Sequence, residues 1–222
     1  MKQDGAPAAR RCFLPVSPVF PVVQKSTTGD TGSTGKRKNE TTMQKSCFLA
    51  GAFPTPWGYV GIAAIGQGLV RVVLPHKRRQ EVRRQIGDAF CYRYVISQSK
   101  TLVAPVQRIL KTAECQILEY LAGKRRSFDL PLAPPQATAF YRAVWRACGE
   151  IPYGETRSYQ WIAQRIGRPK ASRAVGTALA ANPLPLIVPC HRVVRGDGSL
   201  GGFGGGLALK KRLLALEFDN RA

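Results

Sequence analysis

Residues 158–191 read SYQWIAQRIGRPKASRAVGTALAANPLPLIVPCH, and this stretch decides how the second half of the chain folds. Ser158 is a favoured N-cap residue and Gly167 a favoured C-cap residue, so a short helix is expected between them. A tight turn follows, and a second helix is expected over residues 170–181. Two short helices joined by a tight turn that contains glycine are typical of a helix-turn-helix motif.

The second of these helices consists mostly of alanine and other small residues. Its larger exposed groups are Lys170, Arg173 and Thr177. One interpretation is a helix packed closely in a core. The other is a helix that must approach a partner closely, because an ordinary helix is about 10–12 Å across and the DNA minor groove is only about 6 Å wide. In that case Arg173 could reach into the base stack.

The charge of the chain favours a polyanionic partner. Its 222 residues include 34 Lys and Arg but only 13 Asp and Glu, which gives a formal net charge of +21. Such a charge attracts polyanions but says nothing about the fold. Nucleic acid is therefore the leading partner, and a basic tail or a membrane-surface patch is the alternative. No apolar run approaches the roughly 20 residues needed to span a bilayer.

A cysteine beside a histidine follows the second helix. The apolar run before Pro189 predicts a short buried strand that leads to Cys190. The thiolate is the reactive form of cysteine, and an ordinary thiol with a pKa of about 8.5 is mostly protonated at neutral pH. His191 could take the proton directly or through a water, and Glu217 could accept the other imidazole N–H. Adjacent side chains of an extended chain point to opposite faces, so a purely structural role remains the alternative.

The first half of the chain has three regions of different character. Residues 1–42 include STTGDTGSTGKRKNETT, which is polar and rich in Thr and Gly, and we expect a disordered basic extension there because such a composition cannot bury enough apolar surface. Three apolar runs within residues 47–75, separated by Pro-Trp-Gly and Gly-Gln-Gly, predict a small antiparallel sheet. Apolar residues at helical spacing predict a helix over residues 101–123.

A proline-rich stretch, FDLPLAPPQ at residues 128–136, predicts an extended linker. We therefore expect a domain boundary near residue 133, with an N-terminal domain over residues 46–132 and a C-terminal domain over residues 136–222.

Six scattered cysteines, without a CxxC motif, are expected to be reduced thiols, most of them small core residues. The chain has only two histidines, and Cys47 and His76 alone do not make a zinc site. We expect neither a metal nor a cofactor.

Two long motifs resemble a known family. The stretch IPYGETRSYQWIAQRIGRPKASRAVGTALAANPLPLIVPCHRVV, followed by GGLALKKRLLALE, closely resembles the O6-alkylguanine-DNA alkyltransferases, also called methylated-DNA–protein-cysteine methyltransferases. The resemblance covers about residues 46–217. Two further stretches, TPWGYVGIAA and FDLPL…FYRAVW, also resemble this family. Residues 1–42 have no counterpart in the family.

The resemblance implies a fold of the α/β plus all-α class. Its N-terminal domain would be ribonuclease-H-like, with α/β structure and a small antiparallel sheet. Its C-terminal domain would be helical and winged-helix-like and would carry the site. The implied partner is double-stranded DNA containing O6-alkylguanine. The implied protein is a monomer without cofactor, located in the cytoplasm with the nucleoid.

The resemblance also implies a reaction, in which the protein binds duplex DNA through the minor groove and flips an alkylated guanine out of the base stack. Cys190 would accept the alkyl group once and irreversibly, from O6-methylguanine and also from O4-methylthymine. His191 and Glu217 would activate the thiol through water. Tyr159 would donate toward the guanine or crowd the flipping phosphate, and Asn182 would hold the turn beneath the active strand by hydrogen bonds to the backbone.

The implied DNA contacts come from the helix-turn-helix motif. Arg173 would fill the gap left in the base stack, while Gln160, Arg168 and Tyr159 would contact the DNA. The loop GGFGGG at residues 201–206 departs from the family, because Phe203 is its only large side chain and cannot donate a hydrogen bond.

Three other functions are weighed against this one. An alkyltransferase-like protein that clamps lesions without reacting usually carries Trp in place of Cys190. A winged-helix regulator would not need Cys190, His191 and Glu217 together. A cysteine hydrolase would need an oxyanion hole and turnover, and the sequence indicates neither.

Overall fold

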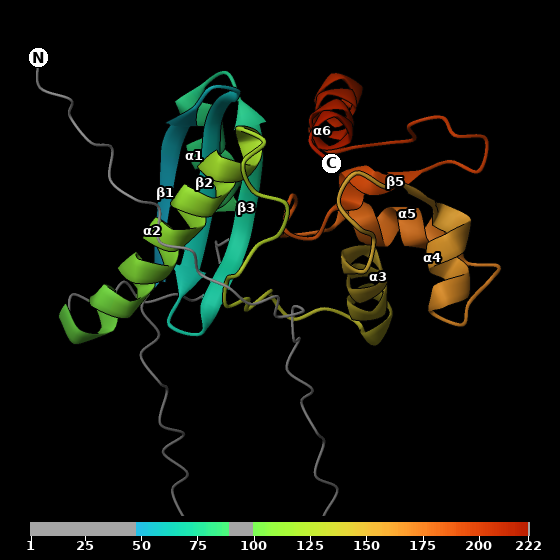
Figure 1. The fold of residues 1–222 in the computed structure, drawn as a ribbon. Coiled ribbons are helices and arrows are strands. Elements are labelled where there is room, and N and C mark those ends of the chain that lie inside the picture. The colour runs from blue at the N-terminus through green and yellow to red at the C-terminus, as the bar shows by residue number, and fades with distance from the viewer. Residues whose placement is uncertain (1–47, 89–99, 222) are drawn as a thin grey trace, which may run out of the picture.

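The computed structural model describes residues 48–88 and 100–221, so the predicted extension over residues 1–42 lies outside the described residues, as does Cys47. Two groups of elements lie side by side in Figure 1, a sheet with two helices and a cluster of helices with two short strands. In chain order the elements are β1 (Phe48–Thr55), β2 (Gly58–Ile65), β3 (Gly68–His76), α1 (Arg79–Asp88), α2 (Lys100–Leu121), α3 (Ala139–Gly149), β4 (Arg157–Ser158), α4 (Tyr159–Arg165), α5 (Ser172–Ala180), a 3-10 turn (Cys190–Arg192), β5 (Val193–Val194) and α6 (Leu207–Asp219).

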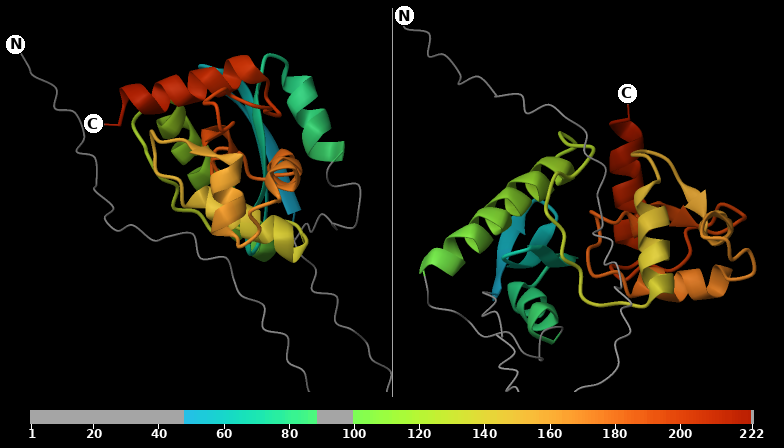
Figure 2. Two further views of the ribbon diagram at one scale, coloured as in Figure 1. Left: turned by 90° about the vertical axis from the view of Figure 1, so that its right-hand side faces the viewer. Right: turned by 90° about the horizontal axis from the view of Figure 1, so that it is seen from below.

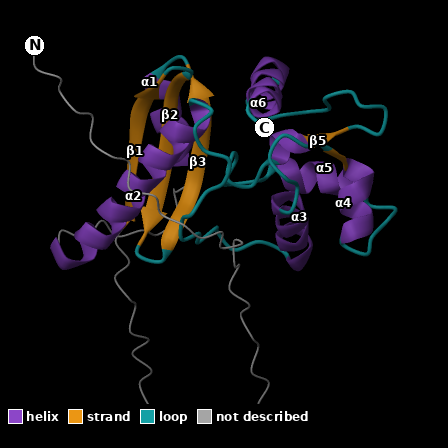
Figure 3. Ribbon diagram, in the orientation of Figure 1, coloured by secondary structure: helices purple, strands orange, loops and turns teal. Residues whose placement is uncertain are grey.

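The first group is the expected small antiparallel sheet, with strand order β1-β2-β3. Both connections are two-residue turns, because Thr55 pairs with Gly58 and Ile65 pairs with Gly68. The turn residues that separated the apolar runs in the sequence therefore make tight hairpins, as predicted. Helices α1 and α2 lie on opposite faces of this sheet (Figure 3).

The two sheet faces belong to two hydrophobic clusters. On one face, Val82 and Ile86 of α1 pack with Val70 and Val73 of β3. On the other face, α2 contributes buried residues such as Ile117 to the main core, which continues into the second group of elements. Among the described residues, no helix is both long enough and apolar enough to cross a membrane.

The proline-rich linker is extended, as expected, and it is docked against the sheet. Leu69 donates its N–H to the Pro131 carbonyl at 2.8 Å and accepts from the Ala133 N–H at 2.9 Å. Gly68 has a φ of +153°, and a Cβ added there would lie 2.5 Å from the Pro131 oxygen. The linker can approach the start of β3 this closely because residue 68 has no side chain.

The second group contains the predicted helix pair. The Ser158 hydroxyl accepts from the Trp161 N–H at 3.0 Å and so caps α4. Gly167, with a φ of +70°, follows the end of that helix. Helix α5 is shorter at both ends than the predicted 170–181, and Trp145 of α3 donates its indole N–H to the Ala178 carbonyl at 2.8 Å.

The predicted strand before the cysteine is wrong. Residues 184–188 form a compact buried turn, in which Val188 donates its N–H to Leu184 at 2.8 Å and Leu186 has a φ of +73°. The three prolines at positions 183, 185 and 189 lack the N–H that a ladder of strand hydrogen bonds requires. The apolar residues are buried, as the pattern indicated, but in a turn that ends at Cys190.

The two groups of elements share a contact surface as well as a core. Val72 of β3 donates its N–H to the Pro183 carbonyl at 2.9 Å, directly after α5. The Tyr120 hydroxyl of α2 donates to Glu217 of α6 at 2.5 Å. Both contacts lie close to the cysteine turn in the fold, so the sheet group supports the segment that carries Cys190. The boundary near residue 133 stays a prediction.

Removal of the Tyr120 hydroxyl should destabilise the protein, because a buried hydrogen bond to a charged carboxylate is lost. Tyr120→Phe is expected to lower the free energy of unfolding by about 1.5–3 kcal/mol in a urea titration. Tyr153→Phe is the matched control, because the Tyr153 hydroxyl is buried and has no hydrogen-bond partner within residues 48–88 and 100–221. Its loss should leave stability unchanged or raise it. Equal destabilisation of the two variants would contradict this account of the interface.

Candidate active site

An open cavity of about 630 Å³ lies between the start of α4, one face of α5 and the loop that follows β5. It brings together several residues that the sequence singled out. Those that line it are Tyr159, Gln160, Arg173, Cys190 and Phe203. Arg195, which the sequence analysis did not single out, also lines it.

The sulfur of Cys190 is held at the wall of this cavity by the cysteine turn. Asn182 donates its side-chain N–H to the Val188 carbonyl at 2.9 Å and accepts from the Leu184 N–H at 3.0 Å. The same Asn182 nitrogen lies 3.4 Å from the Cys190 sulfur. Only 9% of Cys190 is exposed, so a reactant must enter the cavity to reach it.

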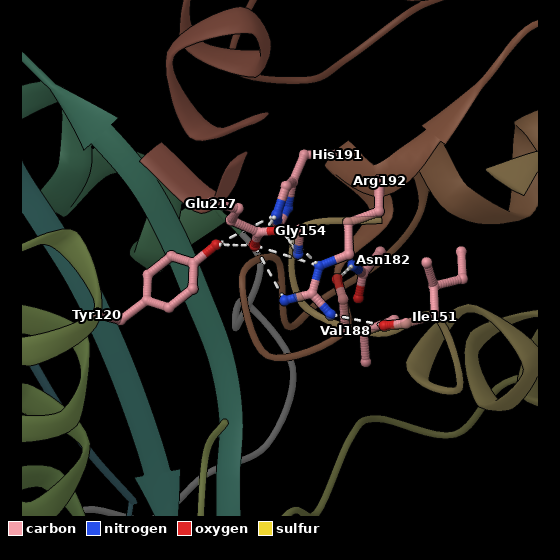
Figure 4. A network of polar contacts seen from close by, with 8 residues as sticks. All are labelled: Tyr120, Ile151, Gly154, Asn182, Val188, His191, Arg192 and Glu217. Atoms are coloured by element: carbon pink, nitrogen blue, oxygen red, sulfur yellow. Dashed lines mark hydrogen bonds and ion pairs between the residues drawn. The ribbon is translucent and has the colours of Figure 1, made fainter. Parts of the chain in front are cut away.

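Glu217 is the centre of a buried polar network (Figure 4). It accepts from the His191 Nε2 at 2.8 Å, the Tyr120 hydroxyl at 2.5 Å and the Gly154 N–H at 3.1 Å. The Arg192 guanidinium adds a bidentate contact, with its Nε 2.9 Å from the carboxylate. Burial would raise the pKa of Glu217, but the hydrogen bonds from His191 and Arg192 lower it to about 2. The carboxylate is therefore ionised at neutral pH.

His191 is fully buried, and its two ring nitrogens have different surroundings. Nε2 faces the ionised carboxylate of Glu217, which assigns the ring proton to Nε2. Nδ1 is buried and has no hydrogen-bond partner among the described residues. Burial lowers the pKa of His191 more than Glu217 raises it, so the ring is neutral and Nδ1 can accept a proton. Within the described residues, no direct hydrogen bond joins this ring to the Cys190 sulfur.

Cys190 is a neutral thiol in the resting protein. Burial raises its pKa, while the Asn182 hydrogen bond and the charge of Lys210 act in the opposite direction. Lys210 is itself buried and donates to the carbonyls of Val193, at 2.5 Å, and Leu200. Burial lowers the pKa of Lys210 to about 8. The site therefore keeps its sulfur protonated but places a cation and a proton acceptor near it.

The loop over residues 201–206 closes one side of the cavity. The Phe203 ring meets the His191 ring edge-on, with centroids 6.5 Å apart. A Cβ added at Gly201, which has a φ of +63°, would lie 2.9 Å from the Tyr159 hydroxyl oxygen. The glycine at position 201 thus leaves room for the Tyr159 hydroxyl beside the loop.

The predicted DNA-contact residues have three different placements. Arg173 is exposed on α5 at the cavity. Gln160 is bonded within the protein, since it donates to the Pro169 carbonyl at 2.8 Å and accepts from Ser172 at 2.5 Å. Arg168 is exposed on the connecting turn and does not line the cavity.

The sequence analysis missed Tyr120, Gly154, Arg192 and Lys210. Tyr120 occupies an apolar position of a helical pattern, and nothing there signals a distant partner. Arg192 and Lys210 look like surface cations in a basic chain. Within the described residues, no group of three or more His, Cys, Asp or Glu could hold a metal ion.

The chain is similar to known proteins both in sequence and in structure. Residues 139–218 match the family described as 6-O-methylguanine DNA methyltransferase, DNA binding domain. The methylated-DNA–protein-cysteine methyltransferase of Methanosarcina barkeri is 50% identical over 114 residues, which are 51% of this chain and 72% of that protein.

Two solved structures resemble the whole described fold. The crystal structure of Mycobacterium tuberculosis O6-methylguanine methyltransferase is 34% identical, with a TM-score of 0.61 over 78% of this chain and 94% of that one. The structure titled Mycobacterium tuberculosis OGT in complex with DNA gives 34% identity and a TM-score of 0.58 over 77% and 93%. The chain therefore belongs to the methylated-DNA–protein-cysteine methyltransferase family.

Proposed function

We propose that this protein repairs alkylated DNA by moving the alkyl group of O6-methylguanine in a duplex onto Cys190, once per molecule. The observation that carries the proposal is the Cys190 thiol at the wall of an open cavity, next in the chain to a neutral His191 whose Nδ1 has no partner. The name of the M. barkeri relative and the DNA complex of the M. tuberculosis protein support the same substrate.

The reaction is a single displacement at carbon. The Cys190 sulfur forms a bond to the alkyl carbon as the bond from that carbon to O6 breaks. The thiol proton passes to the His191 Nδ1 through a water, and the ionised Glu217 stabilises the imidazolium that forms. The guanine leaves with the electron pair of the broken bond, and Tyr159 donates a hydrogen bond to it. The guanine takes up one proton from water and His191 returns the thiol proton to water, so that the protons balance. The product is a neutral thioether that nothing in this step reverses.

The alkylated base reaches the sulfur by leaving the base stack. The cavity of about 630 Å³ lies within the range of about 300–1,000 Å³ typical of small-molecule sites, so it has room for a purine. A base with damaged pairing is cheaper to extrude than an intact one. Arg173 fills the vacated position, while Gln160, Arg168 and Tyr159 contact the backbone beside it.

Several finer assignments belong to the same proposal. O4-methylthymine is a second substrate, and the protein acts as a monomer in the cytoplasm with the nucleoid. The sheet group is a ribonuclease-H-like domain over residues 46–132, and the helical group is a winged-helix-like domain over residues 136–222.

A lesion-binding protein that does not react would need no nucleophile, so Cys190 in this cavity favours alkyl transfer over binding without reaction.

Loss of the sulfur should abolish transfer without abolishing binding. Cys190→Ala is expected to leave no detectable transfer of a radiolabelled methyl group from a DNA duplex, with duplex affinity nearly unchanged. Cys115→Ala removes an exposed thiol and should react like the unmodified protein. Continued labelling of Cys190→Ala would show that another residue is the acceptor.

Arg173 should matter only when a base must be extruded. Arg173→Ala is expected to slow transfer from a duplex by more than about tenfold, or about 1.4 kcal/mol of barrier, and to leave the rate with free O6-methylguanine nearly unchanged. Arg146→Ala removes an exposed arginine of α3 as a control for charge. Equal slowing with both substrates would argue against a role in base extrusion.

The rate of alkyl transfer should begin to fall only at an unusually low pH. Because burial lowers the pKa of His191, the ring stays neutral and able to accept a proton below its ordinary pKa of about 6.5. Rates of transfer from free O6-methylguanine are expected to be level between about pH 7.5 and 6.5 and to fall only below that range. A midpoint at or above pH 6.5 would show that the imidazole is not held neutral.

A further inference from the structure

The outer side of α1 and the turn before it carry a concentrated positive charge. The exposed basic residues there are Lys77, Arg78, Arg79, Arg83 and Arg84. Glu81, the acidic residue in the first turn of α1, forms an ion pair with Arg84 at 2.6 Å. We call the five basic residues the basic tract. The tract belongs to the sheet group, whose contribution to the reactive site is the hydrogen bond from Tyr120 to Glu217.

Arg71 extends the tract toward the second group. It pairs across the sheet with Ala63, whose side chain packs with Val82 of α1. Since paired residues share a face, Arg71 lies on the α1 side. Its Nε is buried and has no hydrogen-bond partner in the part of the chain that the structure describes, and burial lowers the pKa of the guanidinium. A cation that is partly removed from water and has no counterion among the described residues is costly, so an anion bound beside Arg71 would be stabilised.

Arg71 also adjoins α5, the helix that carries Arg173. It lines a cavity of about 650 Å³ together with Ala181 and Pro183, which directly follow α5, and with Thr138 and Tyr141 at the start of α3. The right panel of Figure 2 shows α1 and α5 on the same side of the molecule, away from α2. Helices α5 and α1 therefore share one side of the molecule, and Arg71 lines a cavity beside the end of α5.

We infer that the sheet group binds the DNA backbone directly, with Arg71 taking a phosphate beside the end of α5 and Arg79 and Arg83 taking phosphates farther along the duplex. The inference rests on the proposed function and adds a second contact surface to it. A duplex is a continuous rod with a phosphate charge every 1.7 Å or so of its axis. A duplex that lies along α5 therefore presents phosphates to the basic side chains beyond the end of that helix.

The test compares two double variants that each remove two exposed charges. Arg79→Gln/Arg83→Gln alters the tract, and Arg108→Gln/Lys111→Gln alters exposed residues of α2, on the opposite face of the sheet. Binding to a duplex of about 30 base pairs, roughly three helical turns, is measured at several salt concentrations. The α1 variant is expected to reduce the slope of log affinity against log salt by about 0.9 per lost contact, and the α2 variant to leave the slope unchanged.

Arg71→Gln separates a binding role from a structural one. Removal of an unpaired, partly buried charge should leave the melting temperature unchanged or raise it, while the duplex is bound more weakly. Transfer from free O6-methylguanine should keep its rate in all three variants, which also shows that each is folded. A lower melting temperature with unchanged duplex affinity would assign Arg71 a structural role and overturn its part in the inference.

The outcomes distinguish the two proposals. If the unmodified protein neither binds the alkylated duplex nor accepts its alkyl group, the proposed function itself fails. If it does both, and the α1 variant and Arg71→Gln bind DNA as the α2 variant does, the function stands and the inference is overturned. That second result would indicate that the tract binds a polyanion other than DNA, such as an acidic protein.

Discussion

One buried carboxylate organises this molecule. Removing a charge from water costs several kcal/mol per ion unless enough donors replace the lost hydration, and Glu217 is fully buried. Its donors come from separate segments, namely Tyr120 of α2, Gly154 of a turn, and His191 and Arg192 beside the cysteine. These segments must all be in place before the carboxylate is satisfied. The sheet group and the reactive turn are thereby stabilised together, although the reaction needs only the second.

The same network sets the chemistry of the site. An ionised Glu217 holds the proton of His191 on Nε2 and leaves Nδ1 as an acceptor, while burial keeps the ring and the Cys190 thiol neutral. A protected neutral thiol suits a protein that acts once, because a permanently exposed thiolate would be consumed by other electrophiles. Proton removal is then needed only when a substrate enters. Lys210 favours the thiolate at that moment through its positive charge.

Local signals in the sequence predicted the local features of the fold. Ser158 and Gly167 bound α4 because caps act on the nearest backbone groups, and the turn residues between the apolar runs located the strands. The expected strand before the cysteine was wrong because apolar character reports burial, whereas prolines decide hydrogen bonding. Tyr120 and Lys210 could not be assigned, since their partners are far away in the chain. The Cys-His-Glu set was proposed from the chemistry of its side chains and supported by family resemblance, because spacing alone does not bring residues 26 positions apart together.

The central claim is that the Cys190 sulfur takes carbon from an extruded base and keeps it. The most direct measurement is the intact mass of the protein after mixing with a duplex that contains O6-methylguanine, followed by peptide mapping. The account predicts a single gain equal to one CH2 group, located on the peptide with Cys190 and unchanged by longer incubation or excess DNA. An unchanged mass, a gain on another peptide, or a modification that disappears with time would contradict it.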